Sequence, residues 1–209
     1  MNPNNSISYR VVNGGTSDYL RAGFVTAYKE AFGGHPYYES YSDEEVLRDV
    51  WRPHRLDGII VLALANYSEV VGFGCAKPVL SSSHEIRDFL NLSEQQGTLP
   101  FSSENAWYMS ELGVLASYRG HKIGYALTAQ RLAVISQLGD THYVMRTAAE
   151  GSNSLHLYER IGSVVIPGRQ NVATSDQVQV NQSKSLERVY CYGECLQALS
   201  RIEAIVSGG

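Results

Sequence analysis

The pattern of apolar and polar residues in the first half of the chain predicts three strands and two helices. Residues 58–66 (GIIVLALAN) are apolar almost throughout, which is typical of a strand buried on both faces of a sheet. Residues 16–34 instead place apolar side chains three and four positions apart. That spacing predicts an amphipathic helix that Thr16 or Ser17 caps and Gly33 ends. The remaining elements predicted here are strands at 8–13 and 70–80 and a helix at 43–51, before Pro53.

The second half alternates strands with helices. The longest predicted helix contains the small residues Ala126 and Ala133, which suit it to lie close against a sheet, and Gly139 ends it. Weak helical character also appears near residues 84–92, and a polar loop at about 173–183 precedes the last strand. The predicted elements are strands at 106–114, 142–148, 163–166 and 186–192 and helices at 120–138, 152–161 and 194–206. Their order predicts one α/β (α+β) domain over residues 1–209, a mixed sheet covered by helices.

Composition and charge argue against several classes of protein. The chain has 209 residues, of which 44% are hydrophobic and 18% charged, enough to build a core. Its net charge of −4 argues against a nucleic-acid partner bound by broad neutralisation of phosphates. The longest apolar run, Ile59–Ala65, is far shorter than the roughly 20 residues that span a bilayer, so we expect no membrane partner. The first ten residues show no secretory signal and the three cysteines form an odd set, so we expect a cytoplasmic protein without a disulfide framework.

Residues 112–127, LGVLASYRGHKIGYAL, carry the most informative pattern: a predicted strand ends in a turn and a helix opens. Unpaired N–H groups and the positive end of the helix dipole meet at such a point and can hold a diphosphate. Gly120 and Gly124 let a ligand approach the backbone closely, and Arg119 and Lys122 add positive charge. Neither a Walker A loop nor a G-x-G-x-x-G motif is present. An ordinary strand–helix turn is the alternative interpretation of the glycine spacing taken alone.

This segment resembles the acetyl-CoA motif of the GNAT N-acetyltransferase superfamily. In that family V-x-x-x-x-R/Q-x-x-G-x-G/A follows the fourth strand and opens the third helix. Val114, Arg119 and Gly124 stand at the motif positions. Lys122 replaces the first glycine of the motif, and a helical φ would let its side chain point outward.

A second match follows at the distance expected from the first. The family's next helix carries a motif like N-x-x-A-x-x-L-Y-E-x-x-G-F, and this chain has Leu157-Tyr158-Glu159 and Gly162 in register, with Ser154 at the alanine position and Ser163 at the phenylalanine position. Gly151 occupies the asparagine position, and Asn153, two residues later, is the candidate cofactor contact. The specific resemblance covers about residues 106–165, and the order of elements extends it over most of the chain.

The resemblance implies a GNAT-type fold, mostly antiparallel and splayed between strands 4 and 5, with acetyl-CoA as co-substrate and no metal. The pantetheine arm would insert between the splayed strands and bond to backbone groups of strand 4, and the turn with the helix start would hold the diphosphate. The cofactor-binding residues expected on this basis are Leu112, Gly113, Val114, Arg119, Gly120, His121, Lys122, Ile123, Gly124, Tyr125 and Asn153.

Transfer of an acetyl group to an amine needs a base for the amine and a proton for the departing thiolate. Glu111, on the strand beside the expected thioester, is the candidate base, directly or through a water, since partial desolvation would raise its pKa toward neutrality. Tyr158 matches the family tyrosine that protonates the CoA thiolate. The structural alternatives are an ion-paired or surface Glu111 and a core Tyr158.

The acceptor site is expected to include aromatic and acidic residues of the first helix–helix loop, namely Tyr37, Tyr38, Glu39, Tyr41, residues 43–45 and Trp51, together with Trp107, Tyr108 and the loop at 173–183. Such a wall suits a cationic amine. The alternative is that these aromatics only pack the helices and that the acids face water.

The resulting prediction is a GNAT-type acyltransferase that moves acetyl from acetyl-CoA to a primary amine of a small molecule. Two alternatives are also acyltransferases: one acylates a protein or peptide amine, and the other uses another acyl-CoA. The two remaining alternatives are a non-catalytic acyl-CoA-binding domain and a nucleotide-dependent α/β enzyme. A homodimer is also expected, because the helical tail at 194–206 has an apolar side, with Leu196, Leu199 and Ile202, that no other predicted element covers.

Overall fold

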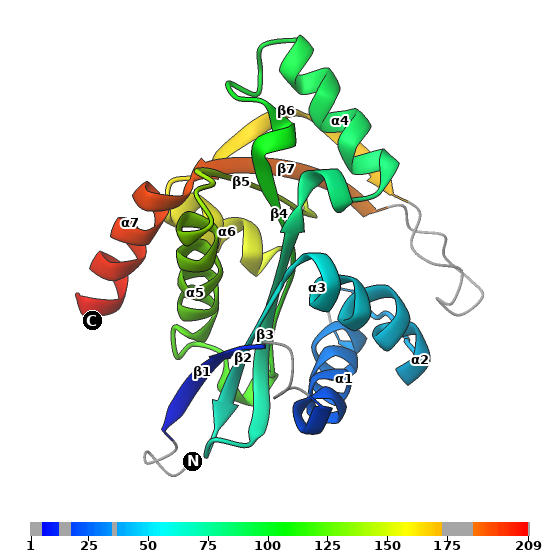
Figure 1. Cartoon of the computed structure of the whole chain (residues 1–209), viewed down its shortest axis with the longest axis vertical. Coiled ribbons are helices and arrows are strands. Elements are labelled where there is room, and N and C mark those ends of the chain that lie inside the picture. The colour runs from blue at the N-terminus through cyan, green and yellow to red at the C-terminus, as the bar shows by residue number, and fades with distance from the viewer. Residues whose placement is uncertain (1–5, 13–17, 35–36, 173–185, 209) are drawn as a thin grey trace.

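The computed structural model describes residues 6–12, 18–34, 37–172 and 186–208, and a seven-stranded sheet with helices on both faces organises them (Figure 1). The strands are β1 (Ile7–Val11), β2 (Ile59–Ala65), β3 (Glu69–Pro78), β4 (Ala106–Val114), β5 (His142–Ala148), β6 (Val164–Val172) and β7 (Leu186–Glu194). The α-helices are α1 (Asp18–Gly33), α2 (Asp43–Glu45), α3 (Arg52–Asp57), α4 (His84–Gln95), α5 (Ile123–Gln137), α6 (Asn153–Arg160) and α7 (Cys195–Ser207). The spatial order of the strands is β1-β2-β3-β4-β5-β7-β6.

The sheet splits in the middle, between β4 and β5. These two strands are parallel and pair only where Ala106–Tyr108 meets His142–Val144. Beyond this point β4 stays paired with β3 and β5 with β7, both antiparallel. The expected mixed, mostly antiparallel sheet that splays between its fourth and fifth strands is therefore confirmed.

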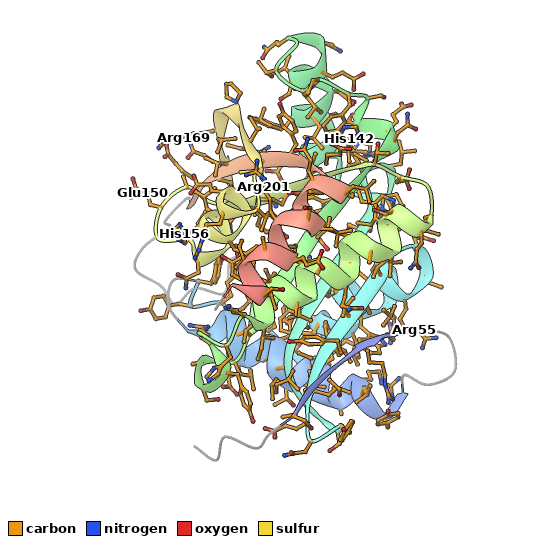
Figure 2. All side chains as sticks on the ribbon, turned by 90° about the vertical axis from the view of Figure 1, so that its left-hand side faces the viewer. Arg55, His142, Glu150, His156, Arg169 and Arg201 are labelled. Carbon is orange, nitrogen blue, oxygen red and sulfur yellow. The ribbon has the colours of Figure 1, made fainter. Side chains whose placement is uncertain are left out.

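Each face of the sheet has its own hydrophobic core. On one face α5 packs on β2, β3 and β4, with α7 beside it, as both views show (Figures 1 and 2). On the other face α1 covers β3 and β4, and an aromatic group that includes Phe24, Tyr28 and Phe73 fills the interior. A third cluster lies under α4, where Phe89 stacks on Tyr190 of β7.

The C-terminal helix buries the predicted side only in part. α7 packs against α5 and buries Cys195, Ala198 and Ile202, with Leu199 partly buried beside them, whereas Leu196 is 64% exposed. Most of the apolar side of the tail thus packs within the chain, and the homodimer stays a prediction. All three cysteines are buried free thiols, as the sequence predicted.

Two predicted helix boundaries are wrong for local reasons. The helix expected at 43–51 continues, through a π-helical stretch at Val46–Trp51, into α3, and Pro53 lies just after this stretch, in the first turn of α3. The long helix begins at Ile123 and not at Gly120, because Gly120 and Lys122 both have positive φ, +80° and +58°. None of the described helices combines the length and the apolar character that a bilayer-spanning segment needs.

Gly113 gives a test of the packing between β4 and the α1 side of the sheet. A Cβ added at Gly113 would lie 2.3 Å from Cζ of Phe73 and 3.0 Å from Cβ of Ala31. We expect Gly113→Ala to lower the free energy of unfolding by about 1–3 kcal/mol, measured by urea denaturation. Gly33→Ala is the matched control, since its added Cβ would meet only Glu39 O at 3.7 Å. Equal midpoints for Gly113→Ala and the wild type would contradict the close packing.

Candidate active site

Two adjoining cavities open where the sheet splays. The large cavity, of about 760 Å³, lies between the end of β4, the start of α5 and α6. The small cavity, of about 260 Å³, lies between the β4 arm and the β5–β7 arm, beneath α1. Phe32, Tyr37, Leu112 and Ser154 line both, so the two cavities lie side by side and share a wall.

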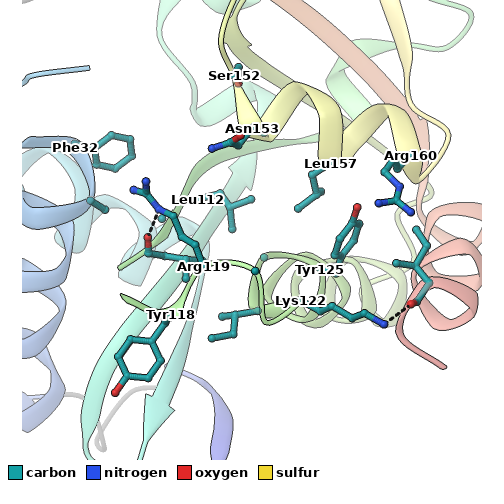
Figure 3. A pocket seen from close by; sticks show the side chains of 18 of the residues that line it. Phe32, Leu112, Tyr118, Arg119, Lys122, Tyr125, Ser152, Asn153, Leu157 and Arg160 are labelled. Atoms are coloured by element: carbon teal, nitrogen blue, oxygen red, sulfur yellow. Dashed lines mark hydrogen bonds between the residues drawn. The ribbon is translucent and has the colours of Figure 1, made fainter. Parts of the chain in front are cut away.

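The wall of the large cavity at the β4–α5 turn presents main-chain donors. Gly120 adopts a φ of +80° that favours glycine, and α5 then begins at Ile123 with no side chain capping it. The first N–H groups of a helix have no partner within the helix, and they carry the positive end of its dipole. A Cβ at Gly124 would lie 3.1 Å from Leu157, so this glycine lets α6 approach α5 closely. Helix starts of this kind bind anions in other proteins. Figure 3 shows Arg119 and Lys122 beside the start of α5.

The side chains around the large cavity carry positive charge. Arg119, Lys122 and Arg160 line it, and no Asp or Glu is among its described lining residues. Arg119 Nε donates to Val114 O at 3.1 Å, which holds the arginine across the turn. A cavity of this sign in a chain of net charge −4 favours an anionic ligand.

Lys122 differs from its predicted conformation. Its φ of +58° is left-handed and not helical, so the lysine takes the backbone shape that the family motif gives to a glycine. Its Nζ donates to Ile205 O at 2.8 Å and to Val206 O at 3.3 Å, near the C-terminal end of α7 (Figure 3). The side chain therefore ties the turn to α7, where a cation is favourable beside the last carbonyls.

Most of the predicted cofactor residues meet at the large cavity. Those that line it are Leu112, Gly113, Val114, Arg119, Gly120, Lys122, Ile123, Gly124, Tyr125 and Asn153. His121 is exposed, its Nδ1 lies 2.9 Å from Arg119 O, and it is not among the lining residues. Asn153 is the first residue of α6, next to Ser152, whose hydroxyl accepts from Leu155 N and caps that helix.

A bulge in β4 places two polar side chains beside the small cavity. Pairing with β3 shifts between Cys75↔Glu111 and Lys77↔Tyr108, so β4 has one residue more than β3 there. As a result Ser110 and Glu111, although adjacent, both reach toward the α1–α3 side. Ser110 lies 2.6 Å from His54 Nε2 and Glu111 contacts Tyr28 of α1.

His54 fixes Ser110 without taking part in proton transfer near neutral pH. Its Nδ1 lies 2.7 Å from Val50 O, which only accepts, so Nδ1 carries the hydrogen and Nε2 accepts from the Ser110 hydroxyl. Burial lowers the pKa of His54 to about 4, so the ring is neutral at pH 7.

Glu111 lies in an environment that disfavours its charged form. Burial, reinforced by the nearby carboxylate of Glu39, raises the pKa of Glu111 to about 7, against an opposing effect of the Tyr28 hydroxyl, which donates to Oε2 at 3.3 Å. Glu39 in turn accepts from Tyr41 Oη at 2.5 Å. At neutral pH Glu111 is thus available both as a carboxylate and as a carboxylic acid.

Tyr158 lies on the opposite side of the small cavity and is 1% exposed. Arg131 of α5, also fully buried, donates from Nη2 to Tyr158 Oη at 3.3 Å and to Thr128 Oγ1 at 3.1 Å. Its Nη1 donates to Cys75 O at 3.0 Å and to Glu111 O at 3.1 Å. Because a guanidinium can only donate, the phenol oxygen accepts this bond and the Tyr158 proton points elsewhere.

The room for Arg131 comes from Gly74 of β3. A Cβ at Gly74 would lie 2.7 Å from Arg131 Nε and 3.0 Å from Cζ. The guanidinium therefore occupies the space of a missing side chain and holds two strands, α5 and Tyr158 in fixed positions.

The predicted acceptor residues divide into two groups. Tyr37, Glu39, Tyr41 and Tyr108 line the small cavity, together with Glu111 and Tyr158. Three predicted aromatic residues line neither cavity: Tyr38 is 61% exposed, Trp51 packs on Phe24, and Trp107 is buried with Nε1 donating to Asp140 Oδ2. Of residues 43–45, Asp43 and Glu44 are exposed, and Asp43 pairs with Lys29. The predicted loop at 173–183 lies outside the described residues.

Sequence reasoning missed several polar residues that the structure brings to the small cavity or its wall, among them Tyr28, Ser110, Arg131, Arg146 and Arg188. A signal existed for two of them. Arg131 falls on the apolar stripe of the predicted helix, four residues after Leu127, and Arg146 interrupts an otherwise apolar predicted strand. Elsewhere in the described part of the chain, no group of three or more His, Cys, Asp or Glu could hold a metal ion.

Comparison with known proteins agrees with these observations. The sequence model of the acetyltransferase (GNAT) family matches residues 22–162. No curated protein sequence matches the chain. Many solved structures share the fold.

Three solved structures illustrate the similarity. YncA, a putative acetyltransferase from Salmonella typhimurium solved with its cofactor acetyl-CoA, is 13% identical with a TM-score of 0.62, covering 91% of this chain and 94% of that one. An N-acetyltransferase from Staphylococcus aureus Mu50 is 14% identical with a TM-score of 0.63, covering 91% and 99%. A chain of the NatC complex bound to Gag peptide and CoA is 17% identical with a TM-score of 0.56, covering 90% and 98%. At these identities the solved structures show the fold alone.

Proposed function

This chain belongs to the GNAT acetyltransferase family, and from that premise we propose that it transfers the acetyl group of acetyl-CoA to a primary amine of a small molecule. The observation that carries the proposal is that the two cavities lie side by side across the splayed sheet and share four lining residues. A donor held in the large cavity by its diphosphate would extend its thioester past Leu112 toward the small cavity, where Glu111 and Tyr158 lie.

The large cavity supplies what coenzyme A needs. Main-chain N–H groups at the start of α5, with Arg119 and Arg160 nearby, would hold the diphosphate. The unpaired edge of β4 beyond Tyr108 offers backbone groups of Leu112 and Val114 to the pantetheine amides. Phe32, Leu112 and Leu157 give the arm an apolar channel.

The small cavity supplies an acid and a base. Glu111, with its pKa near 7, accepts a proton from the acceptor ammonium, directly or through a water, and frees the nitrogen lone pair. The amine nitrogen attacks the thioester carbonyl and the new C–N bond forms. The C–S bond then breaks, the nitrogen releases its second proton to solvent as the amide forms, and a solvent proton restores the Tyr158 hydroxyl after it has protonated the thiolate. Tyr158, whose proton is not engaged by Arg131, donates it to the departing thiolate sulfur. No covalent enzyme intermediate is required.

The acetyl-CoA reaction has a direct test. The purified chain, given acetyl-CoA, should release free thiol only when a primary amine is added, and a panel of amino acids, polyamines, amino sugars and peptides with free N-termini identifies the acceptor. A peptide that outperforms every small amine would assign the acceptor class suggested by the NatC chain, and a higher rate with a longer acyl-CoA would replace acetyl as the group transferred.

Ligand-induced thermal stabilisation separates the proposal from its rivals. Coenzyme A at 100 times its Kd should stabilise the fold by about 2.7 kcal/mol, and NAD or ATP should not. Stabilisation by acetyl-CoA with no thiol release for any amine would indicate a non-catalytic binding domain. Stabilisation by NAD or ATP alone would indicate a nucleotide-dependent enzyme.

A further inference from the structure

The small cavity carries two positive charges in addition to its acids. Arg146 of β5 and Arg188 of β7 line it together with Glu39 and Glu111. Resting on the function proposed above, we propose that the acceptor amine also carries an anionic group, a carboxylate or a phosphate, and that Arg146 and Arg188 bind this group while Glu111 receives the amine.

The register of the sheet places the two arginines together. Arg146 pairs with Tyr190, and Arg188 lies two residues from Tyr190 on the same strand, so their side chains share one face. Tyr190 stacks on Phe89 of α4, which identifies that face as the one away from α5. Glu111, on the β4 arm, contacts Tyr28 on this same side. The acids and the arginines therefore face the cavity from different arms of the splayed sheet.

Neither arginine is fully satisfied by the described residues. Arg146 Nη1 lies 3.4 Å from Glu85 Oε1 and donates to Gln170 Oε1 at 3.4 Å, both long contacts, and its guanidinium carbon lies 6.0 Å from the centre of the Tyr190 ring. Arg188 Nε is buried without a hydrogen-bond partner, and its guanidinium carbon lies 5.7 Å from the centre of the Tyr37 ring. No carboxylate in the described part of the chain pairs with Arg188. Guanidinium groups left in this state favour an anion, which two arginines can bind with several charge-assisted hydrogen bonds.

The charges also discriminate among amines. A polyamine would bring its second ammonium group toward the two guanidinium groups and be repelled, whereas a zwitterion matches acids on one arm and arginines on the other. The wall thus favours amines of the amino-acid or phosphoamine type over the purely cationic amines that the aromatic and acidic residues alone suggested.

Matched pairs of acceptors test the proposal. Phenylalanine against phenethylamine and lysine against cadaverine isolate the carboxylate, and phosphoethanolamine against ethanolamine isolates the phosphate. Thiol release is measured with acetyl-CoA saturating. Either in the carboxylate pairs or in the phosphate pair, the amine with the anionic group should have a kcat/KM at least about tenfold higher than its partner. Arg188→Ala and, separately, Arg146→Ala should raise KM for that member about 10–100-fold and should not raise KM for its counterpart without the anionic group.

Arg169→Ala is the matched control, because this arginine of β6 is exposed, pairs with Glu187 and lines neither cavity (Figure 2). It should change neither KM, and circular dichroism should confirm that all three variants fold. If the amines without an anionic group are equal or better acceptors in the wild type, or if the arginine variants lose both members of a pair alike, the proposal is overturned while acetyl transfer stands.

A binding measurement covers the case in which no amine is acetylated. With coenzyme A present, the anionic amines should raise the Tm of the wild type and of Arg169→Ala but not of Arg188→Ala. That result would support the anion site although the proposed transfer had failed. Equal Tm shifts in all variants, or none in the wild type, would overturn the site as well.

Discussion

Replacing Glu111 by glutamine should lower kcat/KM by about 10²–10⁴ at pH 8 and remove a limb of the pH profile. In the wild type the carboxylate is lost as the pH falls through about 7, the pKa that burial and Glu39 give to Glu111. Below that pH the rate of the wild type should fall by about a factor of ten per unit, whereas Glu111→Gln, which reacts only with amine that has already lost its proton, should show no break near pH 7. The measurement is kcat/KM for thiol release from pH 5 to 9.

The same variant has a stability signature that does not depend on catalysis. The pKa of the Glu111 carboxyl rises on folding from about 4.5 to about 7, so the folded state holds this proton more tightly than the unfolded state. The free energy of unfolding is therefore higher at low pH, and this contribution is lost as the pH rises through 7. The loss is about 3 kcal/mol at most. Glutamine carries no charge, so the Tm of Glu111→Gln relative to the wild type should increase between pH 5 and pH 8.

Glu69→Gln, at an exposed position at the start of β3, is the control for both experiments and should follow the wild type. An acid limb that persists unchanged in Glu111→Gln would eliminate Glu111 as the base, whatever its effect on Tm.

Tyr158→Phe should reduce kcat by about 10²–10³ with little change in the affinity for coenzyme A. The change removes one oxygen at the place where the thiolate departs, while the phenyl ring still fills the buried site between α5 and α6. Arg131 keeps Thr128 and two main-chain oxygens as acceptors, so its charge stays compensated. Single-turnover rates and calorimetric titration with coenzyme A separate the two effects.

Tyr143→Phe is the matched control for the tyrosine. Tyr143 is equally buried, its hydroxyl bonds to Ser163 at 2.7 Å, and its ring lies 6.0 Å from that of Tyr158, but it lines neither cavity. It should lose stability and retain kcat. Wild-type turnover in Tyr158→Phe would remove the proton-donor role.

The elements with strong local patterns were predictable from sequence. The apolar run at 58–66 and the glycine-ended helix of α1 appear where expected, and the two motifs place Gly124 and Leu157 in contact across α5 and α6. Predictions failed where tertiary contacts decide. Lys122 holds a left-handed φ while its Nζ bonds to carbonyls of α7, and α7 turns Cys195 and Ala198 inward rather than Leu196 because α5 lies there.

The candidate site was predictable only on the strands and turns that carry motifs. Glu111 and the α5 turn followed from them, whereas the second polar residue of the bulge, Ser110, depends on a register shift that no sequence pattern marks. Arg146 and Arg188 come together because β7 returns between β5 and β6, a long-range pairing. Trp107 is a residue that the sequence wrongly assigned to the site. Its indole was expected in the acceptor wall, but Nε1 donates to Asp140 Oδ2.

Gly74 lines neither cavity, yet the space beside it affects the proton transfer proposed for Tyr158. Any larger side chain there pushes the side chain of Arg131 away from its five acceptors, and the phenol of Tyr158 loses the neighbour that orients it. Gly74→Ala should therefore be less damaging when a shorter residue replaces Arg131. A damaging substitution in β3 would then impair turnover without touching a single atom that contacts the reactants.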